Sequence, residues 1–196
     1  MTDWFRNTDW DDEIEAAFFA KLDRARSQRD QYIVLQAHHL SQTHPEVALR
    51  LIDLYNETRK EDFHDIRAER IVAAAKFAMG GYVEALDDYL KMLGRQDDDQ
   101  PMFVGSPLEF AFLAARFRSE THYAAALAQL DSMEPPNAKQ VEPYFRYCAA
   151  IALIDSETGS NPTNALANAR IALDTPQVVL DYYPDMVWRL RGITRS

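Results

Sequence analysis

The chain has 196 residues, with 31 acidic and 21 basic side chains and a formal net charge of −10. This acidic excess argues against nucleic acid and anionic membranes as partners, because both are bound through lysine and arginine. No apolar run approaches the roughly 20 residues that cross a bilayer, and the acidic start of the chain is unlike a signal peptide. We therefore expect a cytoplasmic protein, whose charge favours a basic partner or serves solubility alone.

The first two predicted helices are marked by polar residues at their starts. One helix spans about residues 9–26, where Thr8 and Asp11 form a capping-box-like pair and apolar residues recur at three- and four-residue steps. Ser27 and Asp30 repeat the capping pattern, so a second helix begins there.

A helical hairpin is the clearest local pattern. Pro45 starts a third helix, since proline fits the first helical turn. The segment 68–93 then reads as two helices broken at Gly80-Gly81. Glycine adopts the left-handed conformation that ends a helix and lets the chain double back. The sequence therefore predicts a turn at these two glycines.

The second half of the chain continues the helical pattern after a long connection at 95–106, which carries an acidic tip. Further helices are expected at about residues 107–118, 121–133, 142–158 and 162–174. Gly159 ends the third of these, and the tail after Pro176 carries a last helical pattern in Met186, Val187 and Leu190. That tail is predicted to cap the last hairpin.

An alanine-leucine pair recurs in the second helix of each predicted hairpin. The pairs are Ala48-Leu49, Ala85-Leu86, Ala126-Leu127 and Ala165-Leu166, separated by 37, 41 and 39 residues. The residues four positions after each alanine are Ile52, Tyr89, Leu130 and Ala169. A fixed period of this size in helical pairs is typical of a stacked array, in which each hairpin buries its faces against its neighbours.

These residues resemble the tetratricopeptide repeat (TPR) family over about residues 28–176. In the hairpin 69–93 the matching positions are Ala73, Gly80, Tyr82 and Ala85. In the next they are Leu113, Ala114, Phe117, Tyr123 and Ala126, and in the last Ala165, Ala169, Ala172 and Pro176. Lys76 stands where the family has an aromatic residue, and each period exceeds the typical 34 residues. The resemblance implies a protein-interaction scaffold whose concave face binds a peptide or a partner domain.

We therefore expect an all-α fold, a right-handed superhelix of about four TPR-like hairpins with an N-terminal helix and a C-terminal cap. The hairpins are predicted at about 28–57, 63–94, 107–133 and 142–174, with the cap at 176–196. All of them belong to a single domain, 1–196, in this interpretation.

Catalytic and metal-binding patterns are weak. His38, His39 and His44 lack the i, i+4 spacing of a helical metal site, so packing roles are expected. Asp97-Asp98-Asp99 lacks the glycine and terminal glutamate of a calcium loop. The lone Cys148 cannot form an internal disulfide and lies in an apolar segment, which favours a reducing compartment and a buried thiol. We expect no cofactor, no metal and no enzymatic activity.

Basic and aromatic residues on the first helix of each hairpin are the candidate partner-binding residues, because that helix lines the concave side in the family. They are Arg67, Arg70, Lys76, Phe110, Arg116 and Arg146. A row of basic side chains would suit a peptide carboxylate or an acidic segment. The alternative is that these side chains form ordinary solvated faces or intramolecular pairs.

The leading functional hypothesis is non-catalytic protein binding by a bacterial cytoplasmic adaptor or chaperone-like module. A second hypothesis is an acidic neutraliser, immunity protein or secretion chaperone that holds a basic partner protein. A third is self-association, for example as a homodimer, through aromatic residues near the two ends, unless these simply cap the terminal hairpins. The aromatic residues in question are Trp4, Phe5, Tyr182, Tyr183 and Trp188.

Overall fold

The structure, a computed structural model, describes residues 4–94 and 107–195. These residues form helices and turns, with no strand among them, which confirms the all-α prediction. The chain divides into two compact units, Met1–Gly105 and Ser106–Ser196. The superhelix and the single repeat domain remain predictions, and the predicted 95–106 connection lies outside the described residues.

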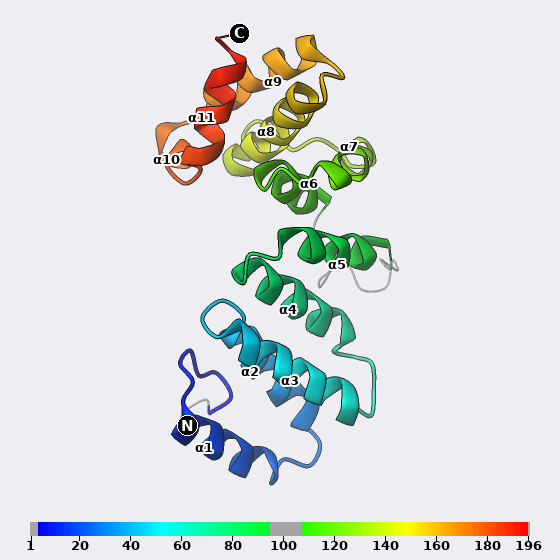
Figure 1. Cartoon of the computed structure of the whole chain (residues 1–196), viewed down its shortest axis with the longest axis vertical. Helices are drawn as coiled ribbons and strands as arrows, with labels where there is room; N and C mark the ends of the chain where they lie inside the picture. The colour runs from blue at the N-terminus through cyan, green and yellow to red at the C-terminus, as the bar shows by residue number, and fades with distance from the viewer. Residues whose placement is uncertain (1–3, 95–106, 196) are drawn as a thin grey trace. The chain divides into compact units, whose positions relative to one another are not determined.

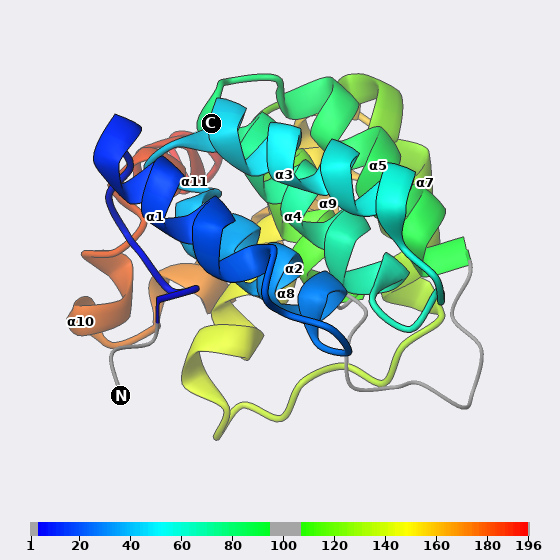
Figure 2. The ribbon, with the colours of Figure 1, turned by 90° about the horizontal axis from the view of Figure 1, so that it is seen from below.

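Unit 1 holds five helices in its described part, as Figure 1 shows. They are α1 (Asp12–Leu22), α2 (Arg29–Leu40), α3 (Pro45–Thr58), α4 (Asp65–Ala78) and α5 (Tyr82–Gly94). Helices α2 and α3 form one antiparallel hairpin, and α4 and α5 form the next. Figures 1 and 2 show α1 alongside the α2–α3 pair, to which it contributes Phe18 and Leu22 as core residues.

The predicted turn between α4 and α5 is confirmed. Gly80 has a φ of 83°, in the left-handed region, and the Gly81 N–H donates to the Lys76 carbonyl oxygen at 2.9 Å. This backbone arrangement satisfies a carbonyl at the end of α4 and reverses the chain direction. Glycine supplies the required conformation without the steric cost that a Cβ atom would add.

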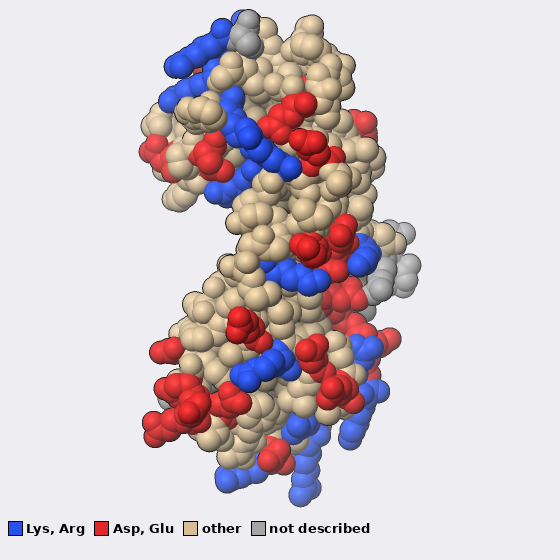
Figure 3. Space-filling model, in the orientation of Figure 1, with Lys and Arg blue, Asp and Glu red and all other residues tan. Residues whose placement is uncertain are grey.

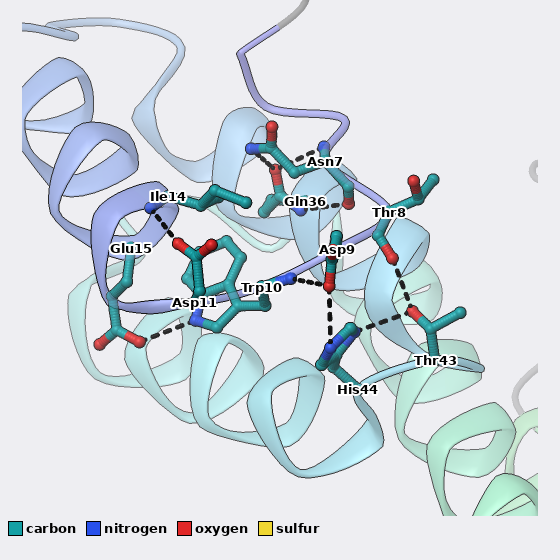
Figure 4. Close-up of polar contacts among 10 residues, drawn as sticks. All are labelled: Asn7, Thr8, Asp9, Trp10, Asp11, Ile14, Glu15, Gln36, Thr43 and His44. Atoms are coloured by element: carbon teal, nitrogen blue, oxygen red, sulfur yellow. Dashed lines mark hydrogen bonds and ion pairs between the residues drawn. The ribbon is translucent and has the colours of Figure 1, made fainter.

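The start of α1 differs from the predicted one. The N-cap is Asp11, whose carboxylate accepts from the Ile14 N–H at 2.7 Å, so Thr8 does not cap the helix. The Thr8 carbonyl oxygen instead accepts from the Thr43 hydroxyl at 3.0 Å (Figure 4). The segment that precedes α1 is therefore held by the α2–α3 turn, and the helix begins later than expected.

Asn7 and Gln36 hold this N-terminal segment on α2 (Figure 4). The fully buried Gln36 side chain accepts from the Asn7 backbone N–H at 3.0 Å and from the Asn7 side-chain amide at 3.0 Å. Its own amide donates to the Asn7 carbonyl oxygen at 2.8 Å. A buried amide needs such partners, since an unpaired one costs free energy.

The predicted cap of α2 is also wrong. The N-cap residue is Gln28, which makes no side-chain capping bond, and not Ser27. The Asp30 carboxylate accepts instead from the Lys60 backbone N–H at 3.4 Å, a contact with the turn before α4. A distant segment has therefore taken the acceptor that the local pattern assigned to the helix start.

Unit 2 holds two hairpins and a C-terminal helix. Its elements are α6 (Pro107–Arg116), the 3₁₀ turn η1 (Glu120–His122), α7 (Tyr123–Asp131), α8 (Val141–Thr158), α9 (Pro162–Leu173), α10 (Gln177–Leu180) and α11 (Pro184–Ile193). Helix α11 packs against α8 and α9 with Met186, Val187 and Leu190 buried, as the predicted cap requires. In both units the recurring alanines lie at helix crossings with at most 1% of their surface exposed: Ala48, Ala85, Ala126 and Ala165.

An unusual backbone conformation follows helix α6, two residues after its end. Arg118 has a φ of 54°, and in the described residues it is the only non-glycine residue with a positive φ. The Ser119 N–H donates to the Ala114 carbonyl oxygen at 3.0 Å, the bond that a glycine normally supports at a helix end. An arginine here carries a backbone strain that glycine would not.

Candidate functional site

The first helices of the two hairpins in unit 1 bring basic groups together. Arg67 and Arg70 lie on α4, and their positive charges act on His38 of the neighbouring helix α2. The pKa of His38 lies below its ordinary value, because of desolvation first, then because of the His39 ring and the two guanidiniums. Three of the groups that act on His38 thus disfavour a further positive charge.

His64, at the start of α4, extends this surface. Desolvation lowers its pKa most and Arg67 lowers it further, whereas the Asp30 and Asp65 carboxylates oppose the change. We call His38, His64, Arg67 and Arg70 the α2–α4 surface. It places two arginines near two histidines, with the Asp30 and Asp65 carboxylates beside His64, and guanidiniums in such a group can bind an anion such as a peptide carboxylate.

Lys76, the third candidate of unit 1, is used inside its own hairpin. Its ammonium forms an ion pair with Asp88 of α5, and Lys91 approaches the same carboxylate at 3.3 Å. The ion pair joins α4 to the facing helix α5 of the same hairpin. The charge of Lys76 is therefore largely balanced within unit 1.

The candidates of unit 2 are covered by the C-terminal segment. The Arg116 Nε lies 3.1 Å from an Asp185 carboxylate oxygen, and its guanidinium lies over the Tyr183 ring. Arg146 pairs with Glu142 at 2.7 Å and donates to the Tyr183 hydroxyl at 2.8 Å. Phe110 is fully buried, so its side chain belongs to the core of unit 2.

Tyr183 organises this polar group. Its ring stacks on Phe145 with centroids 5.3 Å apart, and its hydroxyl donates to Glu142 at 2.6 Å. That hydrogen bond, followed by the charge of Arg146, holds the pKa of Glu142 below its ordinary value, although desolvation opposes the shift. Tyr183 is therefore a buried packing residue. Trp4 and Phe5, at the other end of the chain, are half-buried and pack against the core of unit 1.

A hollow of about 510 Å³ in unit 2 was not predicted from the sequence. It lies between α8 and α11, beside the end of α6, and its charged and aromatic lining consists of Arg118, Glu157, Trp188, Arg189, Arg191 and Arg195. Figure 3 shows basic side chains gathered over α11 on the visible face of unit 2. The available signal was the spacing of Trp188 and Arg191, which places both on one side of a helix.

Other reactive groups in the described residues serve the structure. The described residues contain no group of three or more His, Cys, Asp or Glu side chains that could hold a metal ion. Cys148 is buried, and burial raises the pKa of its thiol to about 11, so the nucleophilic thiolate is disfavoured. Among the same residues, no helix combines the length and the apolar character needed to cross a membrane.

Comparisons of the chain with protein-family models, with curated proteins and with solved structures found no match.

Proposed function

We propose that this chain is a non-catalytic protein-interaction module, an adaptor or chaperone-like protein of the TPR type from the cytoplasm of a bacterium. It binds an acidic peptide or protein segment on the first helices of its hairpins. The α2–α4 surface of unit 1 carries this proposal. There the charges of Arg67 and Arg70 both act on His38, in the unit that holds most of the acidic residues.

The chemistry of the α2–α4 surface supports an anionic partner. Arginine forms forked, charge-assisted hydrogen bonds with carboxylates, and neutral histidines offer additional donors at neutral pH. The repeated alanines Ala48 and Ala85, on the second helices of the hairpins that carry these groups, are fully buried. A rigid scaffold of this kind presents side chains from adjacent helices in a constant arrangement.

Affinity capture from a native lysate tests the proposal. The bait is the wild-type chain, the double variant R67E/R70E, or the matched control R24E/R26E, which makes the same charge change at exposed arginines of unit 1. We expect the wild type and the control to retain one stoichiometric protein at low salt that R67E/R70E loses. Retention of the same protein by all three baits would contradict the proposal.

A second candidate function has its own supporting observation. Exposed carboxylates gather at the start of α1, where Asp11, Asp12 and Glu13 lie in or beside the first turn, and acidic side chains mark this region in Figure 3. A basic partner protein, such as a toxin to be neutralised, would pair with them. Capture that is lost on replacing Asp12 and Glu13 by Asn and Gln, but retained by R67E/R70E, favours this function.

A further inference from the structure

We propose that the hollow between α8 and α11 of unit 2 binds an acidic segment of a partner protein, with Arg191 and Arg195 as its carboxylate-binding groups and Trp188 as its apolar contact. This site goes beyond the function proposed for the α2–α4 surface, because it uses other residues in the other unit. Substitutions at the two sites therefore test the two proposals separately.

The charge of the hollow is only partly balanced by the protein. Glu157 is the one carboxylate in its lining, and it is already shared by Arg189 at 2.5 Å and Arg118 at 3.4 Å. Within the described part of the chain, the guanidiniums of Arg191 and Arg195 have no carboxylate partner. Two arginines without a carboxylate partner beside an open hollow are suited to pair with carboxylates from outside.

Packing of α11 does not explain its outer side. The helix buries Met186, Val187 and Leu190 against unit 2, whereas Trp188 on its other side is 75% exposed. A tryptophan so exposed leaves much apolar surface in water, a cost that a partner's side chain would remove. Tryptophan and arginine are also the residues that most often carry binding energy at protein interfaces.

The walls of the hollow are held in place. Arg189 is only 9% exposed and donates to the Ala115 and Arg116 carbonyl oxygens at 2.9 and 3.1 Å. In the described residues, its Nε is the one buried side-chain nitrogen or oxygen without a hydrogen-bond partner, and it lies beneath the surface of the hollow. Arg118 keeps its left-handed backbone although glycine would fit with less strain, which points to a use for its side chain.

A cation in the last helical turn also stabilises the helix dipole, but that effect needs neither Trp188 nor the hollow. The acidic character of the whole chain repels a dense polyphosphate such as nucleic acid more than a short acidic segment. Free phosphate, in turn, would gain nothing from an exposed indole. An acidic protein segment with an apolar side chain uses both the guanidiniums of Arg191 and Arg195 and the indole of Trp188.

Fluorescence anisotropy with a short fluorescein-labelled peptide of alternating aspartate and phenylalanine tests this site on the full chain. We expect saturable binding that R191E/R195E weakens by about tenfold or more, since like charges replace two pairs. The matched control R170E changes an exposed arginine of α9 outside the hollow and should bind as the wild type. The variant W188A should weaken binding while circular dichroism stays unchanged.

R118G serves as the second variant, because glycine relieves the backbone strain at this position while the cation is lost. We expect it to fold at least as stably as the wild type and to bind the peptide less tightly. The proposal is overturned if the peptide does not bind or if R191E/R195E binds it equally. It is also overturned if asparagine in place of aspartate has no effect, if tripolyphosphate binds more tightly, or if R191E/R195E abolishes a dimer of the free chain.

Discussion

The two units treat the basic residues of their first helices differently. In unit 1, Arg67 and Arg70 act on the histidines of the α2–α4 surface. In unit 2, Arg116 pairs with Asp185, whereas Arg146 pairs with Glu142 and donates to the Tyr183 hydroxyl. Asp185 and Tyr183 reach these arginines because the C-terminal segment folds back onto unit 2. Similar sequence patterns therefore give a charged surface in one unit and an internal polar network in the other.

This difference shows that the segment packed over a helix decides what its charges do. The C-terminal segment pairs Asp185 with Arg116 and places the Tyr183 hydroxyl against Arg146, and it brings three further arginines, Arg189, Arg191 and Arg195, to the hollow. The basic groups of the C-terminal segment, rather than Arg116 and Arg146 of the first helices, therefore line the hollow of unit 2. If that is correct, the contacts that hold α11 are essential to unit 2 and irrelevant to unit 1.

Replacing Arg189 tests this point with the largest expected effect. R189M removes the guanidinium that pairs with Glu157 and that donates to two backbone carbonyls, which should cost about 3 kcal/mol of unfolding free energy although Tyr123 and Arg118 still contact Glu157. Urea denaturation followed by hydrogen exchange should show the loss in α6 and α11, with the amides of unit 1 unchanged. The exposed control R191M should stay within about 0.5 kcal/mol of the wild type. Equal losses in both units would contradict the comparison.

Overpacking the helix crossings asks whether the units share one repeat. Ala85 of unit 1 and Ala126 of unit 2 are fully buried, so A85L and A126L should each cost roughly 1–3 kcal/mol in thermal or urea unfolding. The matched controls A78L and A124L place the same side chain at exposed alanines and should be nearly neutral. A neutral A85L or A126L would mean that the repeat register is wrong in that unit.

The repeat itself could be derived from the sequence, since alanines at a near-constant period and proline or glycine at helix ends are local signals. The helix starts at Pro45, Pro107 and Pro162 follow the predicted positions closely. The fate of Arg116 could not be derived in this way. Its partner Asp185 lies 69 residues away, and a pairing over such a distance depends on the packing of α11 rather than on spacing.

Capping errors have the same origin. Thr8 and Ser27 fit the local capping pattern, but Thr43 and Lys60 supply competing contacts from other segments. The hollow was missed for a related reason. The sequence places Trp188 among aromatic residues that could self-associate or cap the terminal hairpin, and only the folded chain brings Arg118 beside Trp188 and Arg191.

Removing the buried side-chain amide of Gln36 on α2 tests whether a loss of stability in unit 1 leaves unit 2 unchanged. Q36A leaves the Asn7 N–H without its acceptor, which should cost about 1 kcal/mol or slightly more. Faster hydrogen exchange should be confined to the N-terminal segment and α2, while unit 2 keeps its exchange rates. Q31A, an exposed glutamine on the same helix, is the control and should leave both unchanged. Faster exchange in α11 would show that the two units are not independent.

Lowering the pH should reduce the stability of unit 1 but not that of unit 2, and this is the smallest of the expected effects. Histidines whose pKa is lowered on folding bind protons less well than in the unfolded chain, so His38 and His64 should destabilise unit 1 as the pH falls through their ordinary value of 6.5. Glu142 has a lowered pKa too, but a carboxylate stabilises above its ordinary value of 4.5 and loses this contribution only as the pH falls further. Hydrogen exchange from about pH 7.5 to about pH 5.5, corrected for the intrinsic rates, should therefore show a loss of protection in unit 1 alone.

The variant H38Q/H64Q should flatten this pH dependence, because a glutamine does not titrate in the range and the two arginines no longer oppose a protonation step. Y183F is the matched test in unit 2. It removes the hydrogen bond that lowers the pKa of Glu142, and should change the response only below about pH 5. The opposite outcome is that unit 2 loses hydrogen-exchange protection between about pH 7.5 and about pH 5.5 as strongly as unit 1 does. In that case the environment of His38 and His64 would not explain a difference in pH dependence between the units.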